Sequence, residues 1–305
     1  MKGPVLITGG SGLLGVNWAQ KIRHERKTVL GMHNRFIELS GTESTQLELT
    51  DESRLFDQIR DLNPVLVIHT VALTNIELCE RDQESALYIN ANLAANVAKV
   101  CTEIDCKLVF ISTDQLFDGR QAFVSESCPV SPLNVYGKTK AVAEEKVLAS
   151  NPQALIIRTN FFGWGPSYRQ SFSDFIISNL RNSNPITLFD DVSYTPIIVD
   201  ELVNCVHALI EANASGVFNV VGGEAITKYD FGMMLAEEFD LDKRFIEQGV
   251  LSEQSNMTQR PFDMSLSNKK LGGVLGTDIP SLRRQVSELR RKELDSGIQE
   301  ILTLT

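Results

Sequence analysis

Short apolar runs alternate with longer amphipathic stretches along the first 160 residues. The apolar runs predict strands at 5–7, 28–32, 46–49, 65–69, 107–111 and 155–158. The amphipathic stretches predict helices over 12–26, from a cap at Asp51 onward, over 83–104, and from Tyr136 onward. The strands are continuously apolar, which is typical of strands buried on both faces of a parallel sheet. The pattern therefore predicts an α/β fold built on a Rossmann-type, doubly wound parallel sheet.

The regular alternation ends after residue 158. A further strand is expected at 195–200, with Asp200 capping a helix over 201–212, and a last strand at 217–221. The remaining segments do not show the regular alternation of strands and helices that a parallel sheet requires. We therefore expect a Rossmann domain formed by 1–160 and 190–221, a smaller discontinuous lobe formed by 161–189 and 222–280, and a charged C-terminal helix in 281–305. Because no low-complexity linker separates the two lobes, they should form one rigid body.

The composition is that of an ordinary globular protein, with 43% hydrophobic and 22% charged residues among 305. The 29 basic and 39 acidic residues give a net charge of −10. This balance argues against nucleic acid or an anionic membrane as a partner, because both require a basic face. The N-terminus leads directly into a strand without an apolar signal core, and no run approaches the roughly 20 apolar residues that span a bilayer. We expect a cytoplasmic protein.

Cysteine and histidine spacing does not predict a metal site. The five cysteines include no CxxC pair, and His24, His33 and His207 are unclustered. We expect the cysteines to be reduced thiols, as in other cytosolic proteins. His69 ends the fourth predicted strand, and we interpret it as a structural residue rather than a proton relay.

A glycine-rich segment joins the first strand to the first helix. Residues 8–15 read TGGSGLLG, which satisfies G-x-G-x-x-G from Gly10 and a wider GxxGxxG from Gly9. Glycines permit a tight turn and the close approach of a pyrophosphate, while the helix N-terminus offers free amides and a partial positive charge. The segment therefore predicts a nicotinamide dinucleotide site.

The end of the second strand bears on the choice of cofactor. An acid there usually holds the 2′-hydroxyl of NAD. This sequence has none before Glu38, whereas Arg35 could hold the 2′-phosphate of NADP. The pattern favours NADP(H), leaves NAD(H) open, and leaves Arg35 open as a solvated loop residue.

Tyr136 and Lys140 are one helical turn apart and are expected on the same helix face. An adjacent ammonium should lower the pKa of the tyrosine and make it a usable general acid for a ketone that receives hydride. Ser112 and Thr113 end the fifth strand, where ligands bind in open α/β sheets. Each hydroxyl could bind the substrate carbonyl or cap the strand end.

Together these residues resemble the extended short-chain dehydrogenase/reductase superfamily and, within it, the dTDP-4-dehydrorhamnose reductases. The motifs that carry the resemblance are TGGSGLLG at 8–15, HTVALTNIELCE at 69–80, STDQLFDG at 112–119, SPLNVYGKTKAVAE at 131–144, IRTNFFG at 157–163 and QRPFDMSLSNKKLG at 259–272. The resemblance covers nearly the whole chain. It implies NADPH-dependent reduction of the 4-keto group of a nucleotide-diphospho-4-keto-6-deoxy sugar, with the smaller lobe binding that substrate. The sequence leaves open whether the protein forms a homodimer.

The resemblance also implies roles for individual residues. Thr113, Tyr136 and Lys140 would form the catalytic triad, with Asp114 beside the substrate. The implied cofactor residues are Gly9, Gly12, Leu13, Leu14, Glu48, Leu49, Val71, Ala72, Leu73 and Asn90, besides Arg35, Tyr136 and Lys140. Leu73 and Phe161 depart from the family pattern, which usually has tyrosine at the first position and often has a sugar-facing tryptophan at the second.

Two further residues have alternative interpretations. Arg260, in the smaller lobe, could bind the nucleotide diphosphate of the substrate or form a salt bridge between the lobes. Trp164 could flank the sugar or pack as a loop aromatic.

The residues beside Thr113 distinguish ketone reduction from the reactions of related enzymes. In the related sugar-nucleotide 4,6-dehydratases the corresponding triplet is Thr-Asp-Glu. This chain has Gln115 at the third position, and an amide cannot act as a base. Fucose-forming epimerase-reductases carry a cysteine where this chain has Asp114. Ketone reduction needs neither group. Two alternatives stay open: a non-catalytic, NADP-binding regulatory subunit like the methionine adenosyltransferase β subunit, and a reductase or epimerase of another nucleotide sugar.

Overall fold

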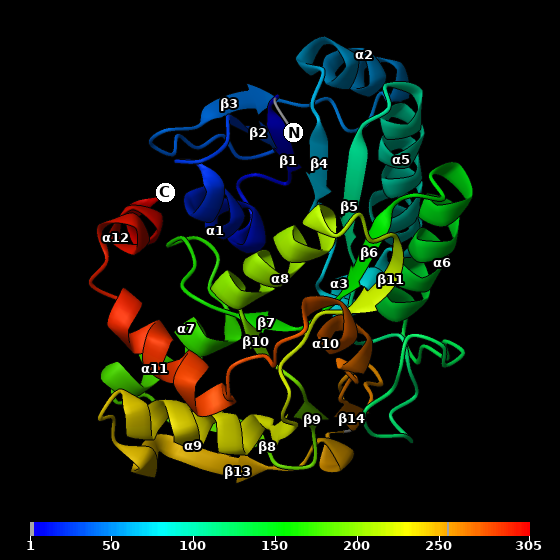
Figure 1. Ribbon diagram of the computed structural model, residues 1–305. Helices are drawn as coiled ribbons and strands as arrows, with labels where there is room; N and C mark the ends of the chain where they lie inside the picture. Colours follow the sequence, from blue (N-terminus) through cyan, green and yellow to red (C-terminus); the bar gives the residue numbers. More distant parts are fainter. Residues whose placement is uncertain (1–2, 255) are drawn as a thin grey trace.

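The computed structural model describes residues 3–254 and 256–305 (Figure 1). Its central sheet has seven parallel strands in the order β11-β6-β5-β4-β1-β2-β3. The strands are β1 Val5–Thr8, β2 Thr28–Met32, β3 Glu43–Gln46, β4 Leu66–His69, β5 Lys107–Ile111, β6 Leu155–Arg158 and β11 Gly216–Asn219. The strand order reverses between β1 and β4, which is the switch point where open α/β sheets bind ligands. The predicted doubly wound Rossmann fold is confirmed.

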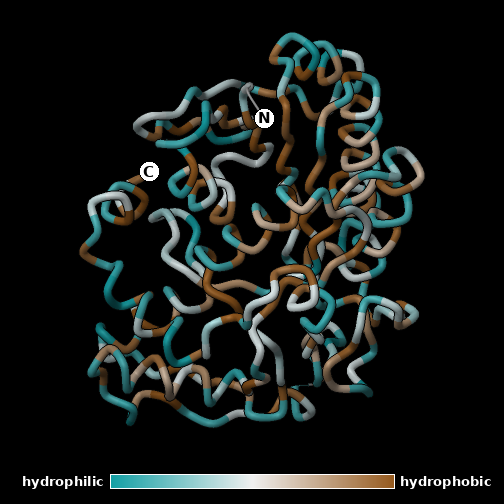
Figure 2. Tube along the Cα trace, in the orientation of Figure 1, coloured by the Kyte–Doolittle hydropathy of each residue, from teal (hydrophilic) through white to brown (hydrophobic). Residues whose placement is uncertain are grey.

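Helices cover both faces of this sheet. One face carries α2 Glu52–Leu62, α5 Leu93–Glu103 and α6 Val135–Ser150, and the other carries α1 Leu13–Ile22 and α8 Val199–Glu211. Successive strand residues alternate between the two hydrophobic clusters: Val5 and Ile7 pack with Trp18, whereas Leu6 packs with Leu55. Figure 2 shows the apolar strands in the interior. Burial on both faces explains why the strands read as unbroken apolar runs.

Two predicted elements of the first half differ from the structure. The third strand lies at Glu43–Gln46, not 46–49, because this edge strand is polar and exposed and therefore escapes a search for apolar runs. The helix expected over 83–104 is three segments: α4 Gln83–Leu87, the π-helical turn η1 Tyr88–Asn92, and α5. Such π turns occur mostly as single turns and are frequent at functional sites.

The second half also departs from the pattern. The expected strand at 195–200 is only β10 Ile197–Ile198, because α8 begins at residue 199. Asp200 is therefore not the cap of this helix: it lies in the first turn, where its carboxylate binds Lys292. The last strand of the sheet ends at residue 219, not 221. The C-terminal segment forms two helices, α11 Leu282–Lys292 and α12 Ser296–Thr303.

The smaller lobe is built from short elements. Its strands, with those that join it to the sheet domain, are β7 Phe161–Phe162, β8 Ile186–Phe189, β9 Ser193–Tyr194, β12 Ile226–Thr227, β13 Ile246–Gly249 and β14 Asp263–Met264. Its helices are α7 Phe172–Arg181 and α9 Lys228–Glu238, with short 3₁₀ turns at Lys243–Phe245 and Leu251–Glu253. Helix α10 Lys269–Leu275, which was expected in this lobe, packs on α8 and β11 of the sheet domain. Helix α3 Ile76–Arg81 precedes α4 in the sheet domain. One hydrophobic cluster includes both Ile7 of the sheet and Phe231 of the lobe.

Membrane and metal features are absent from the part of the chain that the structure describes. There, no helix combines the length and apolarity needed to cross a bilayer. The same residues contain no group of three or more His, Cys, Asp or Glu side chains placed to hold a metal ion.

Candidate active site

The glycine loop forms one end of the site. Gly9 has φ +76°, in the left-handed region, and a Cβ there would lie 2.7 Å from Thr70 Oγ1. A Cβ at Gly15 would lie 2.5 Å from the Gly9 carbonyl oxygen, so the helix packs directly on the loop. Gly12 is the N-cap of α1 and makes no side-chain capping bond, and the first turn contains no acid. This end of α1 therefore offers amides and a positive dipole to an anion, the chemistry a pyrophosphate requires.

A cavity of about 1310 Å³ extends from this loop along the carboxyl ends of the strands. The predicted site residues that line it are Gly9, Gly12, Leu13, Leu14, Arg35, Leu49, Val71, Ala72, Leu73, Thr113, Asp114, Tyr136, Lys140 and Phe161. Glu48, Asn90 and Arg260 are the predicted residues that do not line it. Residues that follow β1, β2, β4 and β6 thus meet residues of β5 and α6 in one space, and only the sheet topology brings them together.

Tyr136 and Lys140 lie in the first turns of α6. Asn134 caps this helix by accepting a hydrogen bond from the Gly137 N–H at 2.8 Å. Both functional side chains are buried, with Tyr136 8% and Lys140 1% exposed. Lys140 Nζ donates to the Ile111 carbonyl oxygen at 2.7 Å and lies 4.1 Å from the Phe110 ring centroid. The lysine is thus held against the end of β5.

The pKa values of this pair differ from the sequence-based expectation. Burial lowers the pKa of Lys140 to about 7. The pKa of Tyr136 is raised to about 12, chiefly by burial and also by the Asp114 charge, while a hydrogen bond from Thr113 opposes the rise. The expected lowering of the tyrosine pKa by Lys140 is not found, because burial dominates and the lysine makes no contribution to the shift. The consequence is a phenol that keeps its proton at neutral pH.

The two hydroxyls at the end of β5 have separate partners. Ser112 Oγ donates to the Glu144 carboxylate at 2.5 Å, and Glu144 forms a buried ion pair with Arg158 at 2.7 Å. Ser112 is thereby committed to a structural network between α6 and β6. Thr113 Oγ1 instead lies beside the Tyr136 phenol in the cavity and accepts a hydrogen bond from the Gln115 N–H at 3.2 Å.

Asp114 lies next to Thr113 and is 2% exposed. Its carboxylate accepts hydrogen bonds from Asn160 Nδ2 at 2.6 Å and from Thr113 Oγ1 at 3.3 Å. Burial raises the pKa of this carboxyl, while Asn160 and Lys228 oppose the rise. Phe161 follows Asn160 and lines the same end of the cavity. This end therefore combines acceptors for hydroxyl groups with an aromatic face, which suits a sugar.

Asn90 does not line the cavity, but its side chain contacts Leu73, which does. Its amide accepts from the Leu73 N–H at 2.7 Å and donates to the Leu73 carbonyl at 3.1 Å and to Thr139 Oγ1 at 3.0 Å. The π turn thus fixes the loop after β4 against α6, so that Asn90 positions Leu73 and does not itself reach the cavity. Glu48, which follows β3, accepts a hydrogen bond from Thr50 Oγ1 at 2.6 Å.

Three further candidate residues make their contacts outside the cavity. Arg260 binds the Glu77 carboxylate and so joins the smaller lobe to α3. Trp164 is buried, donates its indole N–H to the Leu289 carbonyl at 2.9 Å, and is a packed loop aromatic. His69 is also buried: its Nδ1 pairs with Thr8 Oγ1 at 2.7 Å, and desolvation lowers its pKa to about 3. A neutral, enclosed imidazole agrees with the structural interpretation.

Several cavity residues escaped the sequence analysis, including one aromatic and one cationic side chain from the smaller lobe. Tyr168 and Arg169 lie in the irregular segment between β7 and α7 and line the cavity. The Arg35 guanidinium stacks on the Tyr168 ring at 4.1 Å. A loop without periodicity carries no signal for which of its side chains faces a ligand, although an aromatic next to an arginine in an acidic protein is a usable hint.

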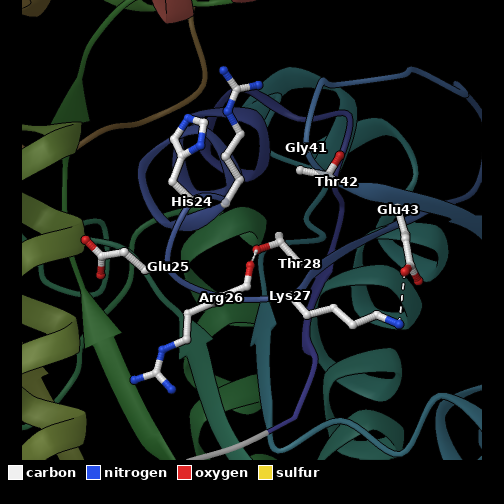
Figure 3. Close-up of a pocket in the computed structure, with 9 residues that line it drawn as sticks. His24, Glu25, Arg26, Lys27, Thr28, Gly41, Thr42 and Glu43 are labelled. Carbon is white, nitrogen blue, oxygen red and sulfur yellow. Dashed lines mark hydrogen bonds and ion pairs between the residues drawn. The ribbon is translucent and has the colours of Figure 1, made fainter.

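Figure 3 shows a second depression, of about 460 Å³, lined by residues 23–28 and 41–43. It lies at the amino ends of β2 and β3, opposite the edge where open α/β sheets bind ligands. Its charges are paired within the protein: Lys27 with Glu43 at 2.9 Å, and Arg23 with Glu300 at 2.7 Å. This depression therefore has no part in the candidate active site.

A Rossmann sheet, a glycine loop and a Tyr-x-x-x-Lys helix around one cavity define the class of short-chain dehydrogenase/reductase folds. The family model described as "RmlD substrate binding domain" matches residues 1–294. The chain therefore belongs to this family of nucleotide-sugar reductases, within the extended short-chain dehydrogenase/reductase superfamily.

Two curated relatives illustrate the functional range of similar chains. The probable low-salt glycan biosynthesis reductase Agl14 of Haloferax volcanii is 29% identical over 287 residues, covering 93% of this chain and 96% of that protein. Methionine adenosyltransferase 2 subunit beta of Xenopus laevis is 28% identical over 274 residues, covering 87% of this chain and 80% of that protein.

Solved structures agree on the fold. A hypothetical dTDP-4-dehydrorhamnose reductase from Sulfolobus tokodaii has a TM-score of 0.81 at 28% identity, covering 92% of this chain and 97% of that chain. The dTDP-4-dehydrorhamnose reductase of Bacillus anthracis, solved in complex with NADP, has a TM-score of 0.84 at 22% identity, covering 96% of this chain and 100% of that chain. At this identity the second similarity establishes the fold alone.

Proposed function

We propose that this protein catalyses the NADPH-dependent reduction of the 4-keto group of a nucleotide-diphospho-4-keto-6-deoxy sugar. The observation that carries the proposal is the meeting of Thr113, Tyr136 and Lys140 in the cavity that begins at the glycine loop. The similar dTDP-4-dehydrorhamnose reductase from Sulfolobus tokodaii supports the substrate class. No nucleic acid or membrane has a role in this reaction.

The residues present fit a dinucleotide. Glycines at 9 and 15 let the loop pack closely on Thr70 and on its own backbone, and the free amides at the start of α1 would face a pyrophosphate in the cavity. Arg35 lines the same cavity at the end of β2, where it would meet a 2′-phosphate, and supports NADP(H) over NAD(H). The NADP complex of the Bacillus anthracis protein agrees with this preference. A bound NADPH would supply the hydride.

Tyr136 would donate its proton to the ketone oxygen at C4 of the sugar. Its raised pKa keeps the phenol protonated at neutral pH, which is the state that reduction requires. Thr113 Oγ1, beside the phenol, would hold the same oxygen. Lys140 would contact the nicotinamide ribose. Asp114 would accept a hydrogen bond from a sugar hydroxyl, and Gln115, lacking a carboxylate, supports reduction over dehydration.

A second candidate is a regulatory, NADP-binding subunit without turnover. The similarity to methionine adenosyltransferase 2 subunit beta favours it, because that protein's name describes a subunit of another enzyme. The retained Tyr136 and Lys140 do not separate the two candidates, since both residues contact the cofactor in either role.

The test is to mix the protein with NADPH and dTDP-4-dehydrorhamnose and follow the absorbance of reduced nicotinamide. Enzymatic reduction predicts substrate-dependent loss of that absorbance. The enzyme proposal is contradicted if NADPH binds tightly but no tested nucleotide-keto sugar is reduced. A methionine adenosyltransferase added to such an inactive protein would then distinguish the regulatory subunit, through complex formation in size-exclusion chromatography.

A further inference from the structure

A short segment of the smaller lobe crosses the mouth of the cavity; we name residues 165–171 the strap. Both ends of the strap are fixed. The Trp164 carbonyl, just before it, accepts from Asn17 Nδ2 of α1 at 2.8 Å, and the Gly165 N–H donates to Asp174 at 2.9 Å. At the other end, Ser171 and Asp174 form a capping box at the start of α7. Fixed ends determine where the middle of the strap lies.

The middle of the strap bridges the two lips of the cavity. Tyr168 Oη donates to the Ser11 carbonyl in the glycine loop at 2.8 Å. The next residue, Arg169, donates from Nη2 to Thr74 Oγ1, in the loop after β4, at 2.8 Å. Both Tyr168 and Arg169 line the cavity together with Gly9 and Gly12. The Arg169 side chain is therefore held at the edge of the cavity by Thr74, one residue along the chain from the Tyr168 contact with the glycine loop.

The charge of Arg169 has no acidic partner within ion-pair distance among the described residues. It donates to the neutral Thr74 hydroxyl, which occupies one of the five N–H donors of the guanidinium. The other strong cations of the cavity are engaged differently: Arg35 stacks on Tyr168, and Lys140 donates to the Ile111 carbonyl. In a protein of net charge −10, an arginine held at a cavity mouth without a carboxylate is suited to an anionic ligand.

We propose that Arg169 binds the diphosphate group of a ligand lying on the glycine loop, so that the strap retains this ligand in the cavity. The inference deepens the proposed function and rests on it for the presence of a dinucleotide. Two ligands of the reaction carry a diphosphate, the dinucleotide and the sugar nucleotide. The contact of the strap with Ser11 favours the dinucleotide, because Ser11 belongs to the pyrophosphate loop. A guanidinium can bind two phosphate oxygens at once, which a lysine cannot do.

The experiment measures equilibrium binding, so that it does not depend on turnover. NADP⁺ and dTDP are titrated separately into the wild-type protein and into Arg169→Met, Arg169→Lys and the control Arg244→Met, by isothermal titration calorimetry. Arg244 is exposed on the smaller lobe, away from the cavity, and receives the same substitution. Because charge-assisted hydrogen bonds contribute about 1.5–3 kcal/mol, Arg169→Met should weaken the Kd for the diphosphate ligand roughly 10- to 100-fold. Arg169→Lys should restore only part of this loss.

The outcomes show which ligand carries the diphosphate that Arg169 binds, and whether the proposal holds. Weaker NADP⁺ binding with unchanged dTDP binding supports the proposal with the cofactor as ligand, and the reverse supports it with the sugar nucleotide. Unchanged binding of both probes in Arg169→Met overturns it, as does equal weakening in Arg244→Met. A wild-type protein that binds NADP⁺ but reduces no keto sugar contradicts the proposed function and leaves the Arg169 test intact. If neither NADP⁺ nor dTDP binds to the wild-type protein, the proposed function and the Arg169 proposal are both overturned.

Discussion

The Arg260 guanidinium binds the carboxylate of Glu77, and this ion pair joins the smaller lobe to helix α3 of the sheet domain. The two residues are 183 positions apart in sequence. Both side chains are partly exposed, with 25% and 42% of their surface accessible. The pair thus connects the two lobes near the active-site helix α6, where Glu80 of α3 accepts from the Val135 N–H at 2.8 Å.

Because this pair is partly exposed, we predict a modest contribution to stability. Arg260→Ala should lower the free energy of unfolding by about 1 kcal/mol, and a double-mutant cycle with Glu77→Ala should give a coupling of about 0.5–1 kcal/mol. Urea unfolding of the four proteins measures both. If Arg260→Ala instead weakened dTDP binding tenfold while Glu77→Ala did not, Arg260 would belong to the nucleotide site.

Tyr136→Phe tests the proton donor. Removal of the hydroxyl should reduce kcat for the keto sugar on the order of 10²- to 10⁴-fold, because the ketone oxygen then receives no proton from a positioned acid. The Kd for NADP⁺ should stay within twofold. Steady-state kinetics and calorimetry measure the two quantities, with Tyr229→Phe in the smaller lobe as the matched control. Substantial activity in Tyr136→Phe would remove the assigned role.

Arg35→Ala tests the choice of cofactor. Loss of a guanidinium that binds the 2′-phosphate should weaken NADP⁺ binding roughly tenfold and leave NAD⁺ binding unchanged. Tyr168→Phe keeps the aromatic face on which Arg35 stacks and should retain the preference for NADP⁺. The ratio of the two dissociation constants is the measurement. An unchanged ratio in Arg35→Ala would contradict the interpretation of the β2 end.

The burial of Lys140 predicts how the free energy of unfolding depends on pH. Its pKa of about 7 in the folded protein lies below the value near 10.4 of an unfolded chain, so the unfolded state binds more protons between these two pH values. The contribution of Lys140 to the free energy of unfolding therefore rises with pH across this window and is least favourable below pH 7. Lys140→Met removes this dependence.

The stability of Lys140→Met relative to wild type should consequently fall by roughly 3 to 5 kcal/mol between pH 6 and pH 10. Urea unfolding of the ligand-free proteins at the two pH values gives the difference. Lys138→Met replaces an exposed lysine on the same helix and should show little such change. A pH-independent difference for Lys140→Met would mean that the ammonium is well solvated in the folded protein.

Much of the fold could be predicted because its signals are local. The buried strands β1, β2, β4, β5 and β6 lie within unbroken apolar runs, and the glycine loop lies between β1 and α1 as expected. The polar edge strand β3 was misplaced because its pairing with β2, not its apolar content, makes it a strand. The π turn at Tyr88–Asn92 was missed because one extra residue in a helical turn leaves the apolar pattern nearly unchanged.

By itself, the sequence determined the buried strands, the glycine loop and the one-turn spacing of Tyr136 and Lys140, since each depends on residues that are near one another along the chain. Only the tertiary structure decided the partners of the two neighbouring hydroxyls, whose residues both line the cavity: Ser112 donates to Glu144 of α6, while Thr113 lies beside Tyr136. It also decided the pKa values, since desolvation depends on what surrounds a group in space. Finally, it placed Arg169 beside Thr74 at the edge of the cavity and paired Arg260 with Glu77, two outcomes that depend on how a distant lobe packs.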